Sequence, residues 1–237
     1  MRIEIWSDIV SPYCYFGLRN FETALARLGD RDQPEIILRA FELDPGAPAR
    51  AQQTLAETLI AKTGQSAEQI EAVLARISQQ AADYGLVFRL EMARPAKTFS
   101  AHRLLYHAAA EGKSLQALER LQRAYFCEGE DLGEPENLVR LLSQIGLDAQ
   151  GIEKAYISSA YENEVDADFH EALIMGVSSL PYVMIDGEHA LTGAQTPDAW
   201  LAALDRAGIK ASRIESAPAL RSLVAPQRRS LPRKRKK

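Results

Sequence analysis

The chain has 237 residues, 46% of them hydrophobic, which is enough for one large domain or a domain with a sizeable insertion. No apolar run approaches the roughly eighteen residues of a membrane span, and no basic-then-apolar leader opens the sequence, so we expect a cytoplasmic protein without a membrane partner. Its two cysteines, Cys14 and Cys127, match no disulfide or zinc framework and favour a reducing compartment.

The formal net charge of −4 conceals an uneven distribution. Residues 210–237 carry 10 Lys and Arg against one acid, Glu215, whereas residues 1–209 carry 18 basic and 31 acidic side chains. This composition predicts a disordered basic tail. Such a tail could contact nucleic acid or an acidic partner, or fold back over the acidic body, and a solvated tail without a partner is the alternative.

The first elements are predicted to be a strand over residues 2–6, a helix from about Pro12 to Leu28 and a strand over 36–43, which together make a parallel β-α-β unit. Ser11 is the predicted N-cap of the helix, and Pro12 occupies its first position. Cys14 then falls in the first turn, where free N–H groups and the helix dipole stabilise an anion and lower a cysteine pKa from about 8.5. The alternative is that Cys14 is only a small buried hydrophobe.

The middle of the chain is predicted to be helical. Two helices fit residues 54–84, and the second begins with the capping-box residues Ser66 and Gln69. A short extended segment or loop follows, and Thr98 is predicted to cap the next helix. Further helical patterns cover 115–126, 135–145 and 149–174, the last with a break near Ser158.

Strands return after the helical block. Residues 182–185 and 189–192 are predicted to pair across the Asp186-Gly187 turn, and a closing helix begins at Thr196-Pro197. Leu180-Pro181 precedes the first of these strands, and the sequence leaves its isomer open. The order of elements predicts an α/β fold with one mixed sheet, helices on both faces and an all-helical insertion.

Five blocks of sequence carry a family resemblance. They are Ser7–Gly17, Phe41–Pro45, Thr98–Leu105, Ala124–Gly129, and Gly176–Val183 together with Gly193–Gln195. In this order they resemble the DsbA family of thioredoxin-like proteins, most of all its FrnE-type members, which are related to kappa-class glutathione transferases and 2-hydroxychromene-2-carboxylate isomerases. The resemblance implies a thioredoxin-like domain from residues 1–48 and 175–209 and a helical insertion over 49–174, with the basic tail, 210–237, outside it.

The resemblance also implies residue roles. Pro181 matches the family's cis-proline, which leaves the backbone of Leu180 free to pair with an extended thiol or disulfide substrate. Ser11 and Cys14 occupy the two reactive positions of a C-x-x-C motif, and serine replaces the first cysteine. A dithiol cycle within the motif is therefore excluded.

The sequence also gives no sign that Ser11 or Cys127 could act as the second reactive group of such a cycle. The Ser11 hydroxyl is too weakly acidic to attack without a base, and the sequence suggests no His-Asp arrangement beside it. Cys127 would need a Cα within about 7 Å of Cys14, which the helical insertion disfavours.

Three functions remain open. The preferred one is a thiol-linked, glutathione-dependent oxidoreductase with a Ser-x-x-Cys motif, in which Cys14 is the redox thiol. The second is a glutathione-dependent transferase or isomerase in which Ser11 donates to the bound thiolate. The third is a non-catalytic binding or chaperone module. Glutathione is the expected co-substrate. The expected partners are a small thiol, an electrophilic substrate or protein disulfides. Whether the chain forms a homodimer stays open.

Other residues are assigned to the substrate site with a structural alternative for each. Pro12 and Tyr13 would edge the site, and Phe16 belongs more often to a core. Gly193, Ala194 and Gln195 would offer backbone N–H groups to a glutathione carboxylate, or form a plain loop. His102 would line the cleft or act as a structural hydrogen-bonder. The remaining histidines show no ligand spacing, so no metal is predicted; they are His107, His170 and His189.

Overall fold

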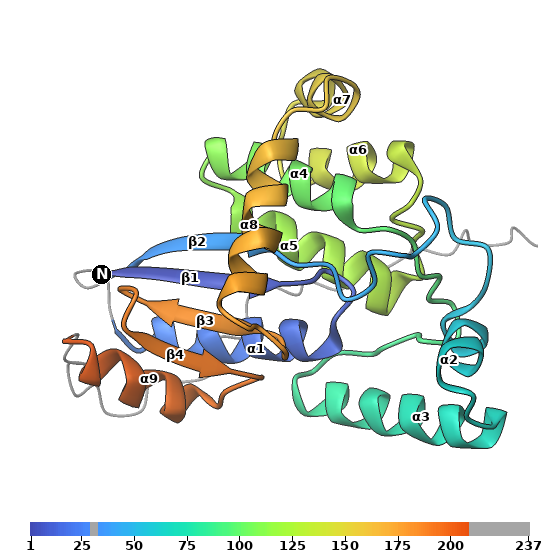
Figure 1. Cartoon of the computed structure of the whole chain (residues 1–237), viewed down its shortest axis with the longest axis horizontal. Helices are drawn as coiled ribbons and strands as arrows, with labels where there is room; N and C mark the ends of the chain where they lie inside the picture. The colour runs from blue at the N-terminus through green and yellow to red at the C-terminus, as the bar shows by residue number, and fades with distance from the viewer. Residues whose placement is uncertain (29–32, 209–237) are drawn as a thin grey trace, which may run out of the picture.

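The computed structural model describes residues 1–28 and 33–208, so the predicted basic tail lies outside the described residues. These ranges contain a mixed sheet with the strand order β2-β1-β3-β4 (Figure 1). Strand β1 pairs in parallel with β2 and antiparallel with β3, which pairs antiparallel with β4. The strands are β1 (Arg2–Ser7), β2 (Glu35–Ala40), β3 (Tyr182–Ile185) and β4 (His189–Thr192).

This topology gathers the chain segments of interest at one end of the sheet. Trp6 at the end of β1 is opposite Arg39 in β2 and Tyr182 in β3, and Tyr182 is opposite Thr192. The ends of β1, β2 and β4 therefore meet the beginning of β3. Strand β2 ends at Ala40 rather than at the predicted Leu43, because the backbone N–H of Leu43 donates to the Asp8 carboxylate over 2.8 Å.

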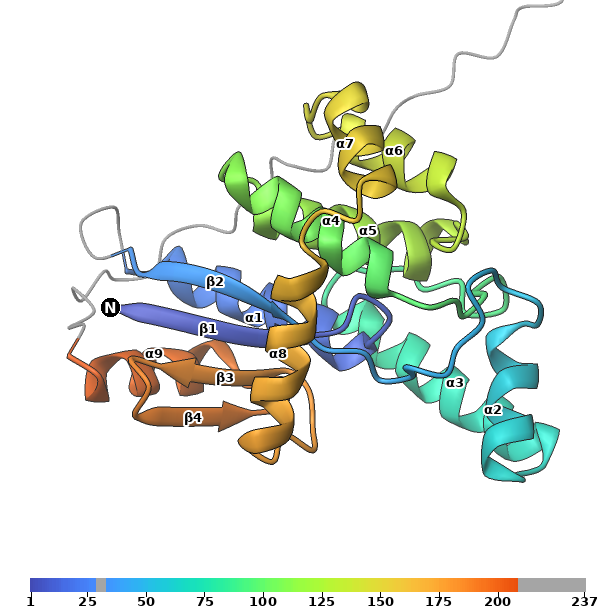
Figure 2. The ribbon, with the colours of Figure 1, turned by 45° about the horizontal axis from the view of Figure 1, so that its top comes forward.

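Helices cover both faces of the sheet, as predicted. Helices α1 (Pro12–Leu25) and α9 (Pro197–Arg206) lie on one face and α8 (Glu162–Ile174) on the other (Figures 1 and 2). Phe21 of α1 and Trp200 of α9 contact each other with ring centroids 4.5 Å apart. Both belong to a buried cluster with apolar residues of the strands, Ile3, Ile5, Val183 and Ile185.

The insertion is helical, as predicted, and the break near Ser158 is confirmed. Its helices are α2 (Leu55–Thr63), α3 (Ala67–Asp83), α4 (Phe99–Ala110), α5 (Ser114–Arg123), the π-helix η1 (Ala124–Glu128), α6 (Pro135–Ser143) and α7 (Ala149–Ile157). Ser66 forms the expected capping box, whereas Thr98 makes no side-chain cap and its hydroxyl points to Glu42 at 3.5 Å. No helix in the described ranges is long and apolar enough to cross a membrane.

An aromatic stack joins the insertion to the start of α1. Phe16 stacks on Tyr84 at 4.8 Å and on Phe88 at 5.6 Å, and Phe88 stacks on Phe126 at 4.7 Å. Phe16 is fully buried, which confirms its place in the core. Packing of this kind contributes about 0.5–1.5 kcal/mol per aromatic pair beyond area burial, so it fixes α1 relative to the insertion.

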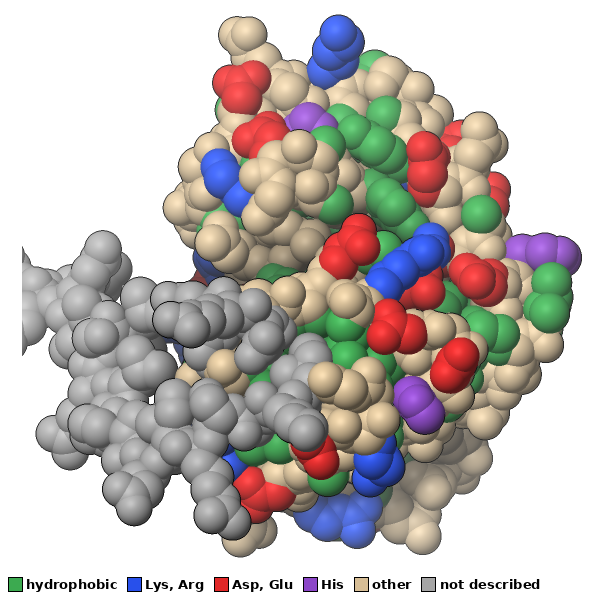
Figure 3. All heavy atoms as spheres, turned by 90° about the vertical axis from the view of Figure 1, so that its left-hand side faces the viewer, with side chains coloured by type: hydrophobic (Ala, Val, Ile, Leu, Met, Phe, Trp, Pro, Cys, Tyr) green, Lys and Arg blue, Asp and Glu red, His purple; other side chains and the backbone are tan. Residues whose placement is uncertain are grey.

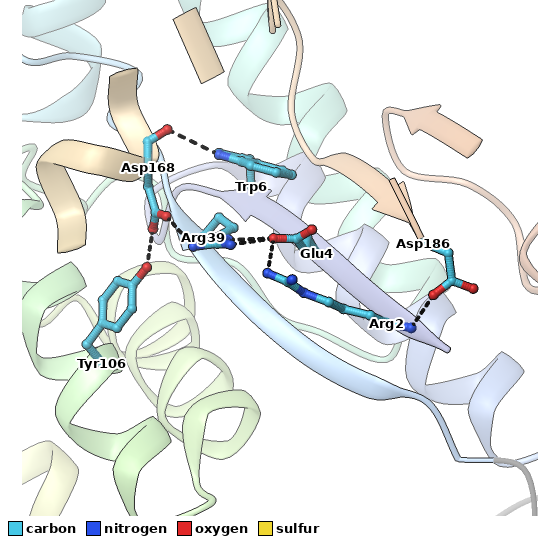
Figure 4. Close-up of polar contacts among 7 residues, drawn as sticks. All are labelled: Arg2, Glu4, Trp6, Arg39, Tyr106, Asp168 and Asp186. Carbon is cyan, nitrogen blue, oxygen red and sulfur yellow. Dashed lines mark hydrogen bonds and ion pairs between the residues drawn. The ribbon is translucent and has the colours of Figure 1, made fainter. Parts of the chain in front are cut away.

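Helix α8 is attached to the sheet by the buried carboxylate of Asp168 (Figure 4). This carboxylate accepts from Arg39 Nη1 at 3.0 Å, from the Ala40 backbone N–H at 2.7 Å and from the Tyr106 hydroxyl at 2.5 Å. The Trp6 indole N–H donates to the Asp168 backbone carbonyl at 3.2 Å. Burial raises the pKa of Asp168, while these donors act in the opposite direction. Helix α8 closes the predicted insertion in sequence but packs on the sheet in space.

The opposite end of the sheet, at the left of Figure 1, has a different character. Figure 3 looks onto this end, and where its surface is visible acidic and basic side chains are interspersed with apolar ones. Arg2 lies at this end and begins a chain of ion pairs that runs along the sheet through Glu4 and Arg39 to Asp168 (Figure 4). Arg39 and Asp168 lie near the other end of the sheet, which carries Ser11 and is shaped in addition by loops and a helix start.

Candidate functional site

The predicted helix start is present in the structure. Ser11 is the N-cap of α1, Pro12 is its first residue, and the Cys14 backbone N–H donates to Ser11 Oγ over 3.2 Å. Ser11 is 3% exposed and Cys14 2%, whereas Tyr13 is 45% exposed. The motif therefore presents its tyrosine to solvent and keeps both reactive side chains inside.

The environment of Cys14 overturns the expectation of a lowered pKa. Its side chain is buried with Trp6, Ala172 and Leu180. Burial raises the pKa of the Cys14 thiol to about 11, although hydrogen bonds from the Ser11 and Ser7 hydroxyls act to lower it. Removal from water outweighs the favourable helix terminus, so Cys14 is a neutral thiol at physiological pH.

Pro181 lies directly against α1. The Leu180–Pro181 peptide bond is cis, as the resemblance implied. A Cβ added to Gly17 would come within 2.8 Å of Pro181 Cγ and 3.6 Å of the Ala194 Cα. A glycine at this helical position thus allows three segments far apart in sequence to meet at the start of α1.

Leu180 keeps open backbone groups. Among the described residues, neither its N–H nor its C=O forms a hydrogen bond with another residue. Its side chain is 8% exposed and contributes to the cluster around Cys14. The arrangement matches the predicted pairing position, and the pairing itself stays a prediction.

The loop after β4 is occupied by the protein's own contacts. The Gly193 N–H donates to the Pro181 carbonyl at 2.8 Å, so it is not free for a carboxylate, contrary to the prediction. The Gln195 amide donates to Thr192 O at 2.6 Å, and Gln195 O accepts from Asn20 of α1 at 2.9 Å. The loop therefore fixes the cis-proline segment to α1.

His102 is a structural residue, and it forms the His-Asp pair that the sequence did not reveal. Its ring is 2% exposed, and Nε2 lies 3.1 Å from the Phe41 carbonyl and 3.5 Å from Asp8 Oδ1. Because the contacts of Nε2 go to Asp8 and Phe41, His102 holds the loop ends around Ser11 and is not placed as a base for the serine hydroxyl.

Asp8 and Gly17 belong to this site and were not predicted as site residues, whereas the sequence indicated Glu42 as a charge at the edge of the cleft or a solvated one. Asp8 is 1% exposed and Glu42 7%. A signal for Asp8 was present, since a carboxylate directly after a strand and before a helix cap marks a loop end with free backbone N–H groups. The burial of Glu42 was not expected, and a glycine inside a helical pattern only hints at a close approach.

Cys127 does not take part in the site. It is half-buried in η1 against the large core of the insertion, while Cys14 belongs to the smaller cluster at the sheet. Both cysteines are free, and burial raises the pKa of Cys127 as well. Within residues 1–28 and 33–208, no group of three or more His, Cys, Asp or Glu side chains could hold a metal ion.

A cavity of about 270 Å³, with both polar and apolar lining residues, lies beside the loop that follows β2. Asp44 and Lys62 line it and form an ion pair, and Gln52 and Gln53 line it as well. Because Leu43 is bonded to Asp8, the cavity begins close to the segment that carries Ser11.

Comparisons with known proteins agree with this architecture. A family model described as a DSBA-like thioredoxin domain matches residues 2–205. A probable DsbA oxidoreductase from Streptomyces coelicolor is 36% identical, with a TM-score of 0.81 over 92% of this chain and 94% of that one. No curated protein matches the sequence.

Two more distant structures share the fold. The cytosolic disulfide reductase DsbM from Pseudomonas aeruginosa is 19% identical, with a TM-score of 0.59 over 87% of this chain and 98% of that one. A 2-hydroxychromene-2-carboxylate isomerase is 18% identical, with a TM-score of 0.64 over 87% of this chain and 96% of that one. At this level of identity the similarity concerns the fold alone.

Proposed function

The chain belongs to the family of DsbA-like thioredoxin domains, and from this premise we propose that it is a glutathione-dependent enzyme of the transferase or isomerase type. The start of α1 holds the glutathione sulfur as a thiolate beside the Ser11 hydroxyl, and this sulfur attacks an electrophilic carbon of a second substrate. In a transfer the sulfur displaces a leaving group, which departs with the electron pair of the broken bond, and in an isomerisation the sulfur itself is expelled again, so neither reaction requires an oxidant.

The burial of Cys14 is the observation that carries this proposal. A serine stands where the attacking cysteine of a C-x-x-C motif would be, and the remaining thiol is 2% exposed with a pKa raised to about 11 by burial. The protein thus offers no accessible thiolate of its own. A helix start with a serine cap is instead suited to an anionic sulfur supplied by a ligand.

Ser11 has the hydrogen-bonding capacity for this role. Its oxygen accepts from the Cys14 N–H, and its hydroxyl hydrogen, which bonds to the Cys14 sulfur in the ligand-free chain, would turn to a bound sulfur as donor. Because Ser11 is 3% exposed in the ligand-free chain, binding requires the surrounding side chains to move apart. A hydrogen bond to a charged group contributes about 1.5–3 kcal/mol.

The rest of glutathione has two further points of contact. The open backbone groups of Leu180 favour main-chain pairing with the tripeptide. The cavity is lined by the Asp44–Lys62 ion pair, which would open so that the two side chains bind the charged ends of the tripeptide. Both features flank the end of the sheet where Ser11 lies.

An oxidoreductase with Cys14 as the redox thiol is the second candidate. Its support is the 36% identity to a probable DsbA oxidoreductase and the hydrogen bonds from the Ser7 and Ser11 hydroxyls to the Cys14 sulfur. In that case Cys14 would form a mixed disulfide with glutathione after the site opens.

Calorimetric titration with glutathione separates the two candidates. We expect Ser11→Ala to weaken binding roughly 10- to 150-fold, from the loss of one hydrogen bond to a charged sulfur, and Cys14→Ala to bind within a few-fold of wild type. Ser66→Ala, which removes the cap of α3 far from the site, is the matched control and should bind as wild type does. Binding that survives Ser11→Ala, together with disulfide exchange that is lost in Cys14→Ala, would support the oxidoreductase instead.

A further inference from the structure

Three titratable side chains from different elements meet behind the start of α1. Asp8 follows β1, Glu42 follows β2 and His102 lies on α4. They are 1%, 7% and 2% exposed, respectively. Buried carboxylates are costly unless paired, so two of them beside one histidine need an explanation.

Asp8 is bound directly to the segment that carries Ser11. Its carboxylate accepts from the Leu43 N–H at 2.8 Å and lies 3.4 Å from the Val10 N–H, and its backbone carbonyl accepts from the Ser11 N–H at 3.2 Å. Asp8 is therefore a positioning residue for Ser11. It also places a negative charge next to the proposed thiolate.

The buried carboxylates of this cluster are only partly compensated by nearby positive groups. Burial, together with the nearby Asp8 carboxylate, raises the pKa values of Glu42, Cys14 and Tyr125. Lys97 and His102 act in the opposite direction on Glu42, and Lys97 is exposed. A further buried anion beside Ser11 would increase this repulsion.

We propose that the Asp8–Glu42–His102 cluster takes up a proton when the thiol bound beside Ser11 loses one. This inference rests on the proposed function. The S–H bond breaks, the electron pair stays on sulfur, and the proton is bound on a Glu42 carboxylate oxygen. Nothing is oxidised or reduced.

Within the cluster, Glu42 is the group best suited to bind this proton. A carbonyl can only accept, so the hydrogen bond to Phe41 requires a proton on His102 Nε2 and keeps the ring in its structural role. Burial already raises the pKa of Glu42 toward neutrality, which reduces the free energy needed to protonate it.

Proton counting during glutathione binding tests the coupling. Calorimetry at pH 7 in buffers of different ionisation enthalpy gives the number of protons released. A free thiol with a pKa of about 8.5 is mostly protonated, so binding as thiolate without uptake releases about one proton. Because Glu42 is the group that binds the proton, we expect the wild type to release well below half a proton and Glu42→Gln to release about one. Glu91→Gln, at an exposed carboxylate, should match the wild type.

The outcomes distinguish the coupling from the function. If the wild type and Glu42→Gln both release about one proton while the thiolate absorbance is present, the coupling is wrong and the proposed function stands. If no thiolate forms in the wild type, both are wrong. Should Glu42→Gln not fold, Asp8→Asn replaces it, and a proton count unchanged from wild type would overturn the coupling.

Discussion

Two buried carboxylates hold the end of β2, and they differ in how completely they are satisfied. Asp168 on α8 accepts from Ala40 N–H, from Arg39 and from the Tyr106 hydroxyl, all within 3.0 Å (Figure 4). Asp8 accepts from Leu43 N–H at 2.8 Å, while its contacts to Val10 N–H and His102 are 3.4 and 3.5 Å. Each carboxylate is 1% exposed.

The difference separates a structural region from a functional one. The charge of Asp168 is matched by Arg39, and the group attaches α8 to the sheet. Asp8 has no Lys or Arg ion pair in the described segments of the chain, and it lies beside Ser11 and a second buried carboxylate, Glu42. Incompletely compensated buried charge of this kind is typical of sites that perform chemistry.

The largest expected effect is on stability at the satisfied carboxylate. Asp168→Asn removes the buried carboxylate that pairs with Arg39 and leaves only Glu4 as its partner, and breaking a buried ion pair destabilises proteins by about 3–5 kcal/mol. Urea unfolding of the variant measures the loss. Asp166→Asn, exposed on the same helix, is the control and should stay within about 0.5 kcal/mol of wild type. If Asp168→Asn is as stable as wild type, Asp168 does not have the structural role assigned to it here.

The next effect concerns the reactivity of Cys14. Burial raises its pKa from the ordinary value of 9.0 to about 11, so its thiolate population at neutral pH is roughly 100-fold below that of a free cysteine. Alkylation of the Cys127→Ser variant with a small reagent, followed against pH, should show an inflection near pH 11. The same chain in denaturant supplies the unburied reference. An inflection below about pH 8.5 would make Cys14 a redox thiol again.

Asp8→Asn should destabilise the fold less than Asp168→Asn does. The amide can still accept from the Leu43 N–H, and no ion pair with an Arg is lost, so we expect about 1–3 kcal/mol. Both variants are compared in one urea series. If Asp8→Asn is the more destabilising of the two, Asp8 is chiefly structural and the contrast drawn above fails.

The smallest effect is expected where α1 meets the cis-proline segment. Gly17→Ala places a Cβ 2.8 Å from Pro181 Cγ, and the resulting overpacking, reduced by the better helix propensity of alanine, should cost about 1–2 kcal/mol. Gly151→Ala in α7 meets only ordinary contacts at 3.4 Å or more and should be neutral or stabilising. Equal stability of the two variants would mean that Gly17 is not needed for the close approach.

The local features of the chain could be predicted from sequence. The Ser11 cap with Pro12, the Ser66 capping box and the Asp186-Gly187 turn each depend on residues a few positions apart. Thr98 shows the limit, because a residue suited to a cap instead points its hydroxyl to Glu42, which comes from another element.

The electrostatics of the site could not be predicted in the same way. The helix start alone predicts a lowered Cys14 pKa, and only the burial of the side chain by Trp6, Ala172 and Leu180 reverses the direction. Similarly, Asp8 and His102 are far apart in sequence, so their contact depends on how α4 docks against the sheet.

We propose above all that the reactive thiolate is the sulfur of a ligand held by Ser11 and not a cysteine of the chain. Ultraviolet difference absorbance of the thiolate during glutathione titration at pH 7 tests it most directly. We predict a saturable signal in the wild type that persists in Cys14→Ala and disappears in Ser11→Ala. A signal that is lost in Cys14→Ala and retained in Ser11→Ala would contradict the claim.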